Sequence, residues 1–358
     1  MGNANAKEIE KQQLIVRNRL LERQATQHLQ VDPAVRNAIN DVKKNHKYTN
    51  LVLPGGAVKG VALVGALGYL HDHRYLTNIT NIACTSAGSI FGTLYAIGYS
   101  VPELKKIVQD LDLAKLAGVN KPLVSDIFHI ATEYGANNGQ HLVDTIGDLI
   151  EKRTGKKNYT LEELWKEKGI NLCITSTDIT TGETIYFWHG RYPKMPIRVL
   201  IRMSTSMPGL FAPVIFDGHY LIDGGLLDNC PIHVFDGKTP DDPYAKLNMT
   251  KVDPCTLAFL LIPDLPVSDC DPILKGDITA GIPQKPVNNI RGMEDYLGAM
   301  VNTVVDSGVE RYQKPSYWLR TVPIHVPNYP SYHFGLTHNQ KMDLLSCGHS
   351  DTAEFFKV

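Results

Sequence analysis

The sequence predicts an α/β protein in which helices cover both faces of a central, mostly parallel sheet, a three-layer α/β/α arrangement. Three observations indicate this fold class. Short apolar strands alternate with helices from residue 48 onward, and turns rich in glycine and proline separate them. The composition is that of a globular protein, because 43% of the 358 residues are hydrophobic and 20% are charged.

The composition also excludes several classes of function. A formal net charge of -1 argues against a protein that binds nucleic acid in bulk. The six cysteines are scattered without a C-x-x-C pair, which argues against a disulfide scaffold and a structural zinc site. The longest nearly apolar run, from Val61 to Leu70, is about half of the roughly 20 residues that a membrane span needs. The first thirty residues are basic and lack an apolar core, so we expect no secretory signal and a cytoplasmic protein.

Residues 1–47 are predicted to form a helical extension of a main domain that covers residues 48–358. The stretch 6–29 is rich in charged residues and glutamine and predicts a mostly polar helix. Pro33 suits the first turn of a second short helix that runs to about Lys44. We interpret the extension as a packing element, with a dedicated interaction arm as the alternative.

Gly2 is a candidate for N-myristoylation, because removal of Met1 would expose it. Ala6 stands where this motif prefers Ser or Thr, so an unmodified N-terminus is the alternative. A single myristoyl chain gives only marginal membrane binding, so stable residence on a membrane would need a second contact.

The elements of the main domain follow one another in a regular order. We predict strands at 51–53, 79–84, 172–175, 184–188 and 257–262, helices from 57 to about 71 and from 87 to about 99, and a hairpin at 215–222 that turns at Asp217-Gly218. Thr337 and Gln340 form a capping box at the start of a last helix that ends at Phe356. The proline-rich stretch 267–289 is predicted to be a long irregular loop near the active face.

The first segment that indicates chemistry is Gly55-Gly56-Ala57-Val58-Lys59-Gly60, between a strand and a helix. It lacks the Ser or Thr after Gly-Lys of a P-loop, and its glycines do not have the spacing of a dinucleotide-binding loop. Backbone N–H groups at such a turn are suited to an oxyanion hole, which stabilises the negative oxygen of an acyl-transfer intermediate. The alternative is an ordinary strand-to-helix turn.

The second segment is Cys84-Thr85-Ser86-Ala87-Gly88, again between a strand and a helix. It approximates the nucleophile elbow G-x-S-x-G, in which a serine is held in a sharp, strained turn between small neighbours. Ser86 is therefore a candidate nucleophile, and a turn with no catalytic role is the alternative.

The third segment is Asp223-Gly224-Gly225, which follows the predicted hairpin. Asp223 is a candidate general base that takes the proton from Ser86. An ordinary Asp-Gly turn is the alternative.

A glycine-rich loop, a serine elbow about thirty residues later and a distant Asp-Gly-Gly together resemble the patatin-like phospholipase family. The segments 177–182, 204–211, 223–231 and 334–337 are also similar to family segments, so that the resemblance covers about residues 48–356. It implies the family's three-layer fold and the hydrolysis of phospholipid or related acyl-lipid esters at a membrane surface, through an acyl-serine intermediate, with no metal and no cofactor.

The resemblance also implies roles for single residues. Ser86 would be the nucleophile and Asp223 its base, in a dyad rather than a triad. Gly55, Gly56 and Ala57 would supply the oxyanion hole, and Lys59 matches the basic residue of that loop.

The sequence departs from the family pattern at two positions. Ala57 replaces the third glycine of the loop, and we expect it to be tolerated with a negative φ. Cys84 replaces the first glycine of the elbow, while Gly88 is retained. We expect the Cys84 side chain to occupy the tightest contact of the elbow, with activity retained in an altered geometry.

Two other functions compete with this interpretation. One is a Ser-His-Asp α/β-hydrolase that uses one of the downstream histidines His233, His325, His333 and His338. The other is a catalytically degenerate member of the family that binds lipid or acts as a scaffold.

Overall fold

The computed structural model describes residues 31–118, 134–236, 252–263, 315–327, 329 and 333–357. Gly2, the predicted helix 6–29 and the predicted loop 267–289 lie outside the described residues. Within the described ranges, none of the helices is both long and apolar enough to cross a membrane.

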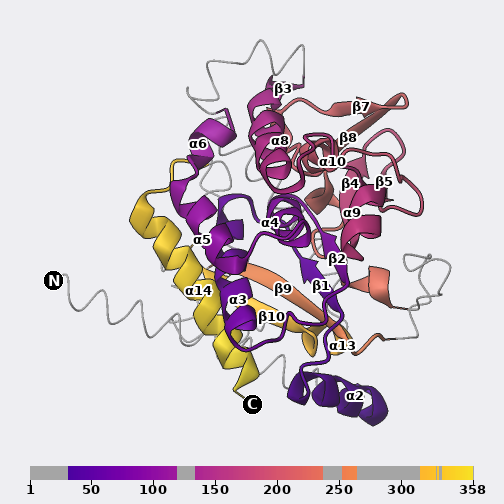
Figure 1. Cartoon of the computed structure of the whole chain (residues 1–358), viewed down its shortest axis with the longest axis vertical. Coiled ribbons are helices and arrows are strands. Elements are labelled where there is room, and N and C mark those ends of the chain that lie inside the picture. The colour runs from indigo at the N-terminus through magenta and orange to yellow at the C-terminus, as the bar shows by residue number, and fades with distance from the viewer. Residues whose placement is uncertain are drawn as a thin grey trace, which may run out of the picture.

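A mixed sheet of eight strands forms the centre of the molecule, in the order β10-β9-β1-β2-β4-β8-β7 with β5 paired to β4 (Figure 1). The mutually parallel strands are β1 (Asn50–Leu53), β2 (Asn81–Cys84), β4 (Asn171–Asp178), β9 (Thr256–Pro263) and β10 (Thr321–Val326). The antiparallel pairs involve β5 (Glu183–Phe187), β7 (Val214–Phe216) and β8 (His219–Asp223). Outside this sheet, β3 (Gly135–Asn137) pairs with β6 (Gly209–Phe211).

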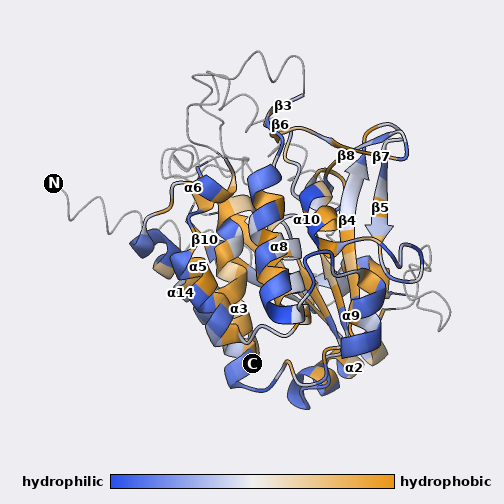
Figure 2. Cartoon of the chain, turned by 45° about the horizontal axis from the view of Figure 1, so that its top comes forward, coloured by the Kyte–Doolittle hydropathy of each residue, from blue (hydrophilic) through white to orange (hydrophobic). Residues whose placement is uncertain are grey.

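Helices flank the sheet, among them α8 and α9, which turn a polar side outward (Figure 2). They are α2 (Pro33–Lys44), α3 (Val61–Asp72), α4 (Ala87–Ala96), α5 (Val101–Asp110), α6 (Leu113–Leu116), α8 (Gln140–Thr154), α9 (Leu161–Lys168), α10 (Ile197–Ser204), α13 (Pro315–Trp318) and α14 (His338–Phe356). Short 3-10 turns are η1 (Ala57–Gly60), η3 (Gly224–Leu226) and η4 (Ile232–Phe235). The predicted α/β class with a central, mostly parallel sheet is confirmed.

The two faces of the sheet carry side chains of different size. Successive side chains of a strand point to opposite faces, and the larger ones, such as Leu53 and Phe259, join the main core with the long helices. The smaller ones, such as Ala83 and Cys173, face η4 and Tyr317 of α13. Among the described residues, the layer that η4 and α13 form on this face is therefore much thinner than the layer of long helices on the other face.

Three asparagines form a ladder at the amino ends of the parallel strands. Asn50, Asn81 and Asn171 are register partners on β1, β2 and β4. Asn81 Nδ2 donates to Asn50 Oδ1 at 2.9 Å, and Asn171 Nδ2 donates to Asn81 Oδ1 at 3.4 Å. His189 extends the ladder, with its Nδ1 at 2.8 Å from Asn171 Oδ1. Because a slip by one residue would break these pairs and turn the core side chains outward, the ladder specifies the register.

Most predicted elements agree with the structure. The predicted helix from Pro33 to Lys44 and the final helix to Phe356 are confirmed, and so is the capping box at Thr337. The second strand begins at Asn81 rather than at residue 79, and α4 ends at Ala96 rather than at residue 99. The hairpin and the strand pair around the Thr-Thr-Gly turn are confirmed as β7–β8 and β4–β5.

Helices α3 and α14 lie side by side (Figure 1), and glycines let their backbones touch. A Cβ placed at Gly65 of α3 would lie 1.9 Å from the carbonyl oxygen of Leu345. A Cβ placed at Gly348 of α14 would lie 1.8 Å from the carbonyl oxygen of Ala62. Neither backbone can give way cheaply, so the C-terminal helix packs at a distance that only glycine allows.

We predict that Gly65→Ala lowers the free energy of unfolding by about 2–3 kcal/mol, because the added methyl group must separate the two helices. Alanine is otherwise favoured over glycine in a helix by about 1 kcal/mol, so the clash must outweigh this gain. Urea unfolding measures the change. Gly335→Ala is the control, because a Cβ there has no atom within 4 Å, and its effect should stay below about 0.5 kcal/mol. An equal effect of the two substitutions would contradict the close packing.

Candidate active site

The candidate site lies where two strands meet end to end on one edge of β4. Ile174 of β4 pairs with Cys84 of β2 on one side and with β5 on the other. Ser176, two residues further along, pairs with β5 and with Asp223 of β8. Strands β2 and β8 therefore occupy the same edge of β4 and run toward each other. Because β2 ends at Cys84 and β8 ends at Asp223, the residues that follow β2 face the end of β8.

Ser86 occupies the turn between β2 and α4. Its φ of 48° and ψ of -123° are unfavourable for a residue with a side chain. The Ser86 N–H donates to Ser204 Oγ at 2.8 Å, which anchors the turn. A Cβ at Gly88 would lie 2.2 Å from Leu53 O, so the first turn of α4 packs directly on the backbone of β1. This is the strained strand–turn–helix geometry of a nucleophile elbow.

The tightest contact of the elbow is at Gly88 and not at Cys84, where we had expected it. Cys84 is fully buried, and its Sγ donates to the Cys173 carbonyl oxygen at 3.4 Å. Its side chain lies opposite Gly92, where an added Cβ would be 3.4 Å from both Cβ and Sγ of Cys84. A second glycine, one helical turn after Gly88, thus provides the space for Cys84.

The Ser86 hydroxyl donates a hydrogen bond of 2.6 Å to Asp223 Oδ2. The other carboxylate oxygen accepts the Gly225 N–H at 2.8 Å, which orients the carboxylate. Burial raises the pKa of Asp223 to about 6, while the hydrogen bonds from Ser86 and Gly225 limit the rise because they favour the charged form. A carboxylate with this pKa is suited to accept a proton near neutral pH.

The glycine-rich loop between β1 and α3 faces the same point. The Gly55 N–H donates to the Asn229 carbonyl oxygen at 3.2 Å, so it is not available to a ligand. The N–H groups of Gly56 and Ala57 have no acceptor among the described residues. Lys59 is buried within η1, at 8% exposure. An oxyanion hole in this loop would therefore use Gly56 and Ala57 and not all three residues that we had named.

The expectation of a negative φ at Ala57 is wrong. Its φ is 47°, in the left-handed region that favours glycine. The turn needs this conformation because the chain reverses from β1 into η1 within three residues. Ala57 therefore keeps the backbone path of the loop with about 1 kcal/mol of strain.

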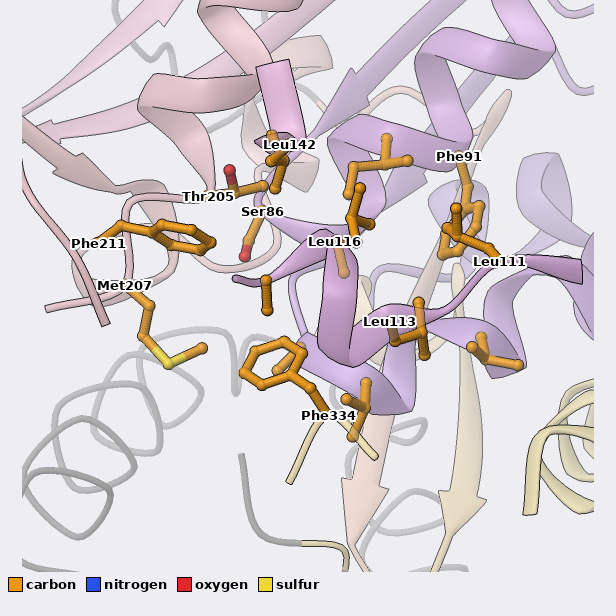
Figure 3. Close-up of a pocket in the computed structure, with 16 residues that line it drawn as sticks. Ser86, Phe91, Leu111, Leu113, Leu116, Leu142, Thr205, Met207, Phe211 and Phe334 are labelled. Atoms are coloured by element: carbon orange, nitrogen blue, oxygen red, sulfur yellow. The ribbon is translucent and has the colours of Figure 1, made fainter. Parts of the chain in front are cut away.

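An apolar pocket opens at Ser86 (Figure 3). Ser86 and Thr205 are its polar lining residues, and the others are apolar side chains or alanines from η1, α3, α4, α5–α6, α8 and β6 and near α14. Leu116, Leu113, Leu111 and Phe91 extend away from Ser86 on one side, while Met207 and Phe211 lie on the other. An apolar slot with a serine hydroxyl in its wall is suited to an acyl chain.

None of the four candidate histidines, which all lie in the described ranges, is hydrogen-bonded to Ser86. His233 contacts Tyr186 and Asp228, and His325 contacts Asp351. Among the described residues, the acceptor of the Ser86 hydroxyl is a carboxylate and not an imidazole. A group of three or more metal-ligating side chains is also absent from these residues. The geometry thus favours a Ser–Asp pair over a Ser-His-Asp triad.

The model of the patatin-like phospholipase family matches residues 51–236, slightly more than half of the chain. The chain belongs to the patatin-like phospholipase family. The match includes the glycine loop, the elbow and the aspartate segment.

Relatives of this family member come from distant sources. An uncharacterized protein of Acanthamoeba polyphaga mimivirus is 31% identical over 84% of this chain and 90% of its own length. A probable lipid hydrolase of Invertebrate iridescent virus 6 is 27% identical over 52% of this chain and 63% of its own length. The crystal structure of VipD from Legionella pneumophila has the same fold, with a TM-score of 0.53 and 16% identity over 87% of this chain and 67% of that one.

Sequence reasoning missed three residues that shape the site. Ser204 anchors the elbow, and Asn229 contacts Gly55. The buried Arg202 donates to Ser206 and to the Ala212 carbonyl oxygen, which holds the segment that carries Met207 and Phe211. All three lie in or next to segments that resemble the family, but their contacts are tertiary, so no local pattern indicates them.

We predict that Ala57→Gly raises the free energy of unfolding by about 0.5–1 kcal/mol, because glycine relieves the strain of the positive φ. Thermal or urea unfolding measures the change. Ala66→Gly in the middle of α3 is the control, and it should lower stability by about 1 kcal/mol or more. A loss of stability in Ala57→Gly as large as that of the control would show that Ala57 is not strained.

Proposed function

We propose that this family member is a serine-dependent lipid acyl hydrolase of the phospholipase A type, with Ser86 as nucleophile and Asp223 as general base. The observation that supports it best is the 2.6 Å hydrogen bond from Ser86 to Asp223 at an apolar pocket that Ser86 lines. Such an arrangement brings an activated oxygen next to the position that an acyl chain would occupy.

The reaction follows from this geometry. Asp223 accepts the proton of Ser86 as the serine oxygen attacks the ester carbonyl carbon. The N–H groups of Gly56 and Ala57 stabilise the negative oxygen that forms, a contribution of about 3–4 kcal/mol for one donor. The protonated Asp223 then donates its proton to the departing alcohol oxygen, which leaves an acyl-serine. In the second step Asp223 takes a proton from a water molecule as that water attacks the acyl-serine carbonyl carbon, and it returns the proton to Ser86 Oγ as the fatty acid leaves.

The pocket supports a lipid substrate rather than a small polar ester. An acyl chain that enters between α4 and α6 would bury its methylene groups against leucine and phenylalanine side chains, at about 0.8 kcal/mol for each methylene. The polar head group would remain outside. One relative is named a probable lipid hydrolase, and a Candida albicans relative is named a lysophospholipase, which agrees with this class.

We further propose that the protein is cytoplasmic and meets its substrate peripherally, at a phospholipid bilayer. Four exposed apolar side chains support such a contact. Ile215 and Tyr220 are cross-strand neighbours, Ile179 follows β4 beside them, and the Tyr134 ring meets that of Tyr220 edge-on at 6.2 Å. A lipid anchor at Gly2 would add a second contact, and it remains a proposal from the sequence.

We predict that Ser86→Ala and Asp223→Asn each lower phospholipid hydrolysis by at least about 10³-fold, because they remove the nucleophile and its base. Mass spectrometry of the products from a lipid panel measures the loss and identifies the ester bond that is cleaved. Ser350→Ala is the matched control, because this serine of α14 hydrogen-bonds through Oγ to the Cys347 carbonyl oxygen and does not line the pocket.

A fluorophosphonate probe separates the enzyme from a degenerate, lipid-binding member of the family. Labelling that disappears in Ser86→Ala and persists in Ser350→Ala would demonstrate an activated serine. A folded wild type that neither reacts with the probe nor hydrolyses any lipid would support the non-catalytic alternative.

We predict that kcat/KM for a soluble short-chain ester is constant above about pH 7 and falls tenfold per pH unit below about pH 6. The base must be ionised, and the pKa of Asp223 is raised to about 6. A rate that stays constant down to pH 4.5 would contradict the role of Asp223.

The same raised pKa has a consequence for stability. Between about pH 4 and pH 6 the folded state binds more protons than the unfolded state, so burial of Asp223 lowers stability as the pH rises through this window. At pH 8 the free energy of unfolding of Asp223→Asn should therefore be higher than that of the wild type by about 1–3 kcal/mol, although we expect the variant to be inactive.

A further inference from the structure

Asn229 lies between the glycine-rich loop and the turn that follows Asp223, and it is nearly buried, at 8% exposure. Its carbonyl oxygen accepts the Gly55 N–H at 3.2 Å. Its side-chain Nδ2 donates to the Gly55 carbonyl oxygen at 3.4 Å. One residue thus holds both peptide groups that flank Gly55.

The hydrogen bond from Asn229 Nδ2 to the Gly55 carbonyl oxygen also determines the direction of the Gly56 N–H. In a planar trans peptide the C=O of Gly55 and the N–H of Gly56 lie in one plane and point in opposite directions. Because Asn229 holds the Gly55 carbonyl oxygen, it directs the Gly56 N–H away from itself. Glycine has little intrinsic preference for one backbone conformation, so without this contact the peptide group would be free to rotate.

The Asn229 side chain also fits closely against both halves of the site. A Cβ at Gly55 would lie 2.4 Å from Asn229 Oδ1, and a Cβ at Gly225 would lie 2.7 Å from the same atom. Gly225 is the residue whose N–H orients the Asp223 carboxylate. The amide of Asn229 therefore fills the space that two glycines leave, one in the loop and one beside the base.

We propose that Asn229 is a positioning residue that orients the Gly56 N–H as an oxyanion donor and holds it at a fixed position relative to the Asp223 carboxylate. The proposal rests on the acyl-hydrolase function proposed above. An oxyanion donor acts on the negative charge of the transition state and not on the bound substrate, so misorientation lowers kcat and leaves KM nearly unchanged.

Asn229→Ser tests the role, because it keeps the backbone carbonyl and removes Nδ2. Asn81→Ser is the matched control, because it removes an amide from the asparagine ladder at the other end of the strands. With p-nitrophenyl butyrate as substrate, Asn229→Ser should lower kcat by 10- to 100-fold with KM within about twofold of the wild type. Asn81→Ser should lower the unfolding midpoint but leave kcat within about twofold.

Asn229→Leu separates orientation from packing and keeps the test available if Asn229→Ser does not fold. Leucine has nearly the size and shape of asparagine, but it carries no charge and lacks the Nδ2 donor to the Gly55 carbonyl oxygen. It should lower kcat at pH 7.5 about as much as serine does, whereas a side chain that only fills space would leave kcat unchanged.

The outcomes distinguish the two proposals. A wild type whose turnover depends on Ser86, with folded Asn229 variants that keep kcat within twofold, would overturn the positioning role alone. A fall in kcat that Asn81→Ser reproduces would overturn it as well. A wild type whose turnover is the same in Ser86→Ala would overturn the proposed function and, with it, the role of Asn229.

Discussion

The shared edge of β4 is the constraint on which the rest of the site depends. It accommodates the end of β2 and the end of β8, which run in opposite directions and stop within two register positions of each other. Ser86 and Asp223 approach because the residues that follow β2 meet the end of β8. The elbow, the glycine loop and the Asn229 contacts adjust this approach to hydrogen-bond distance.

Several features of the site cost stability, and the remainder of the fold must offset them. Ser86 and Ala57 both have positive φ, and burial of Asp223 disfavours its charged form. The compensation lies outside the site, where large side chains fill the main core and α14 packs against α3 backbone to backbone. Close packing elsewhere in the fold thus offsets the free-energy cost of the strain near the nucleophile.

Much of the fold could be predicted from the sequence, because its signals are local. Apolar runs bounded by glycine or proline predict β1 and β9, and Pro33 and Thr337 mark helix starts. The site could be predicted from the sequence only in part. The motifs indicated Ser86 and Asp223 as candidates, but their hydrogen bond spans 137 positions of the chain. The engagement of the Gly55 N–H depends on residue 229, and the positive φ of Ala57 depends on the path of the chain from β1 into η1, so no pattern within the loop reveals either one.

The asparagine ladder has a consequence beyond the register of the sheet. Strands β1 and β2 contain four residues each, so at about 3.3 Å per residue their two ends are only about 10 Å apart. The ladder therefore stabilises the sheet about one strand length away from the nucleophile, while Ser204 and the packing of Gly88 on β1 hold the elbow locally.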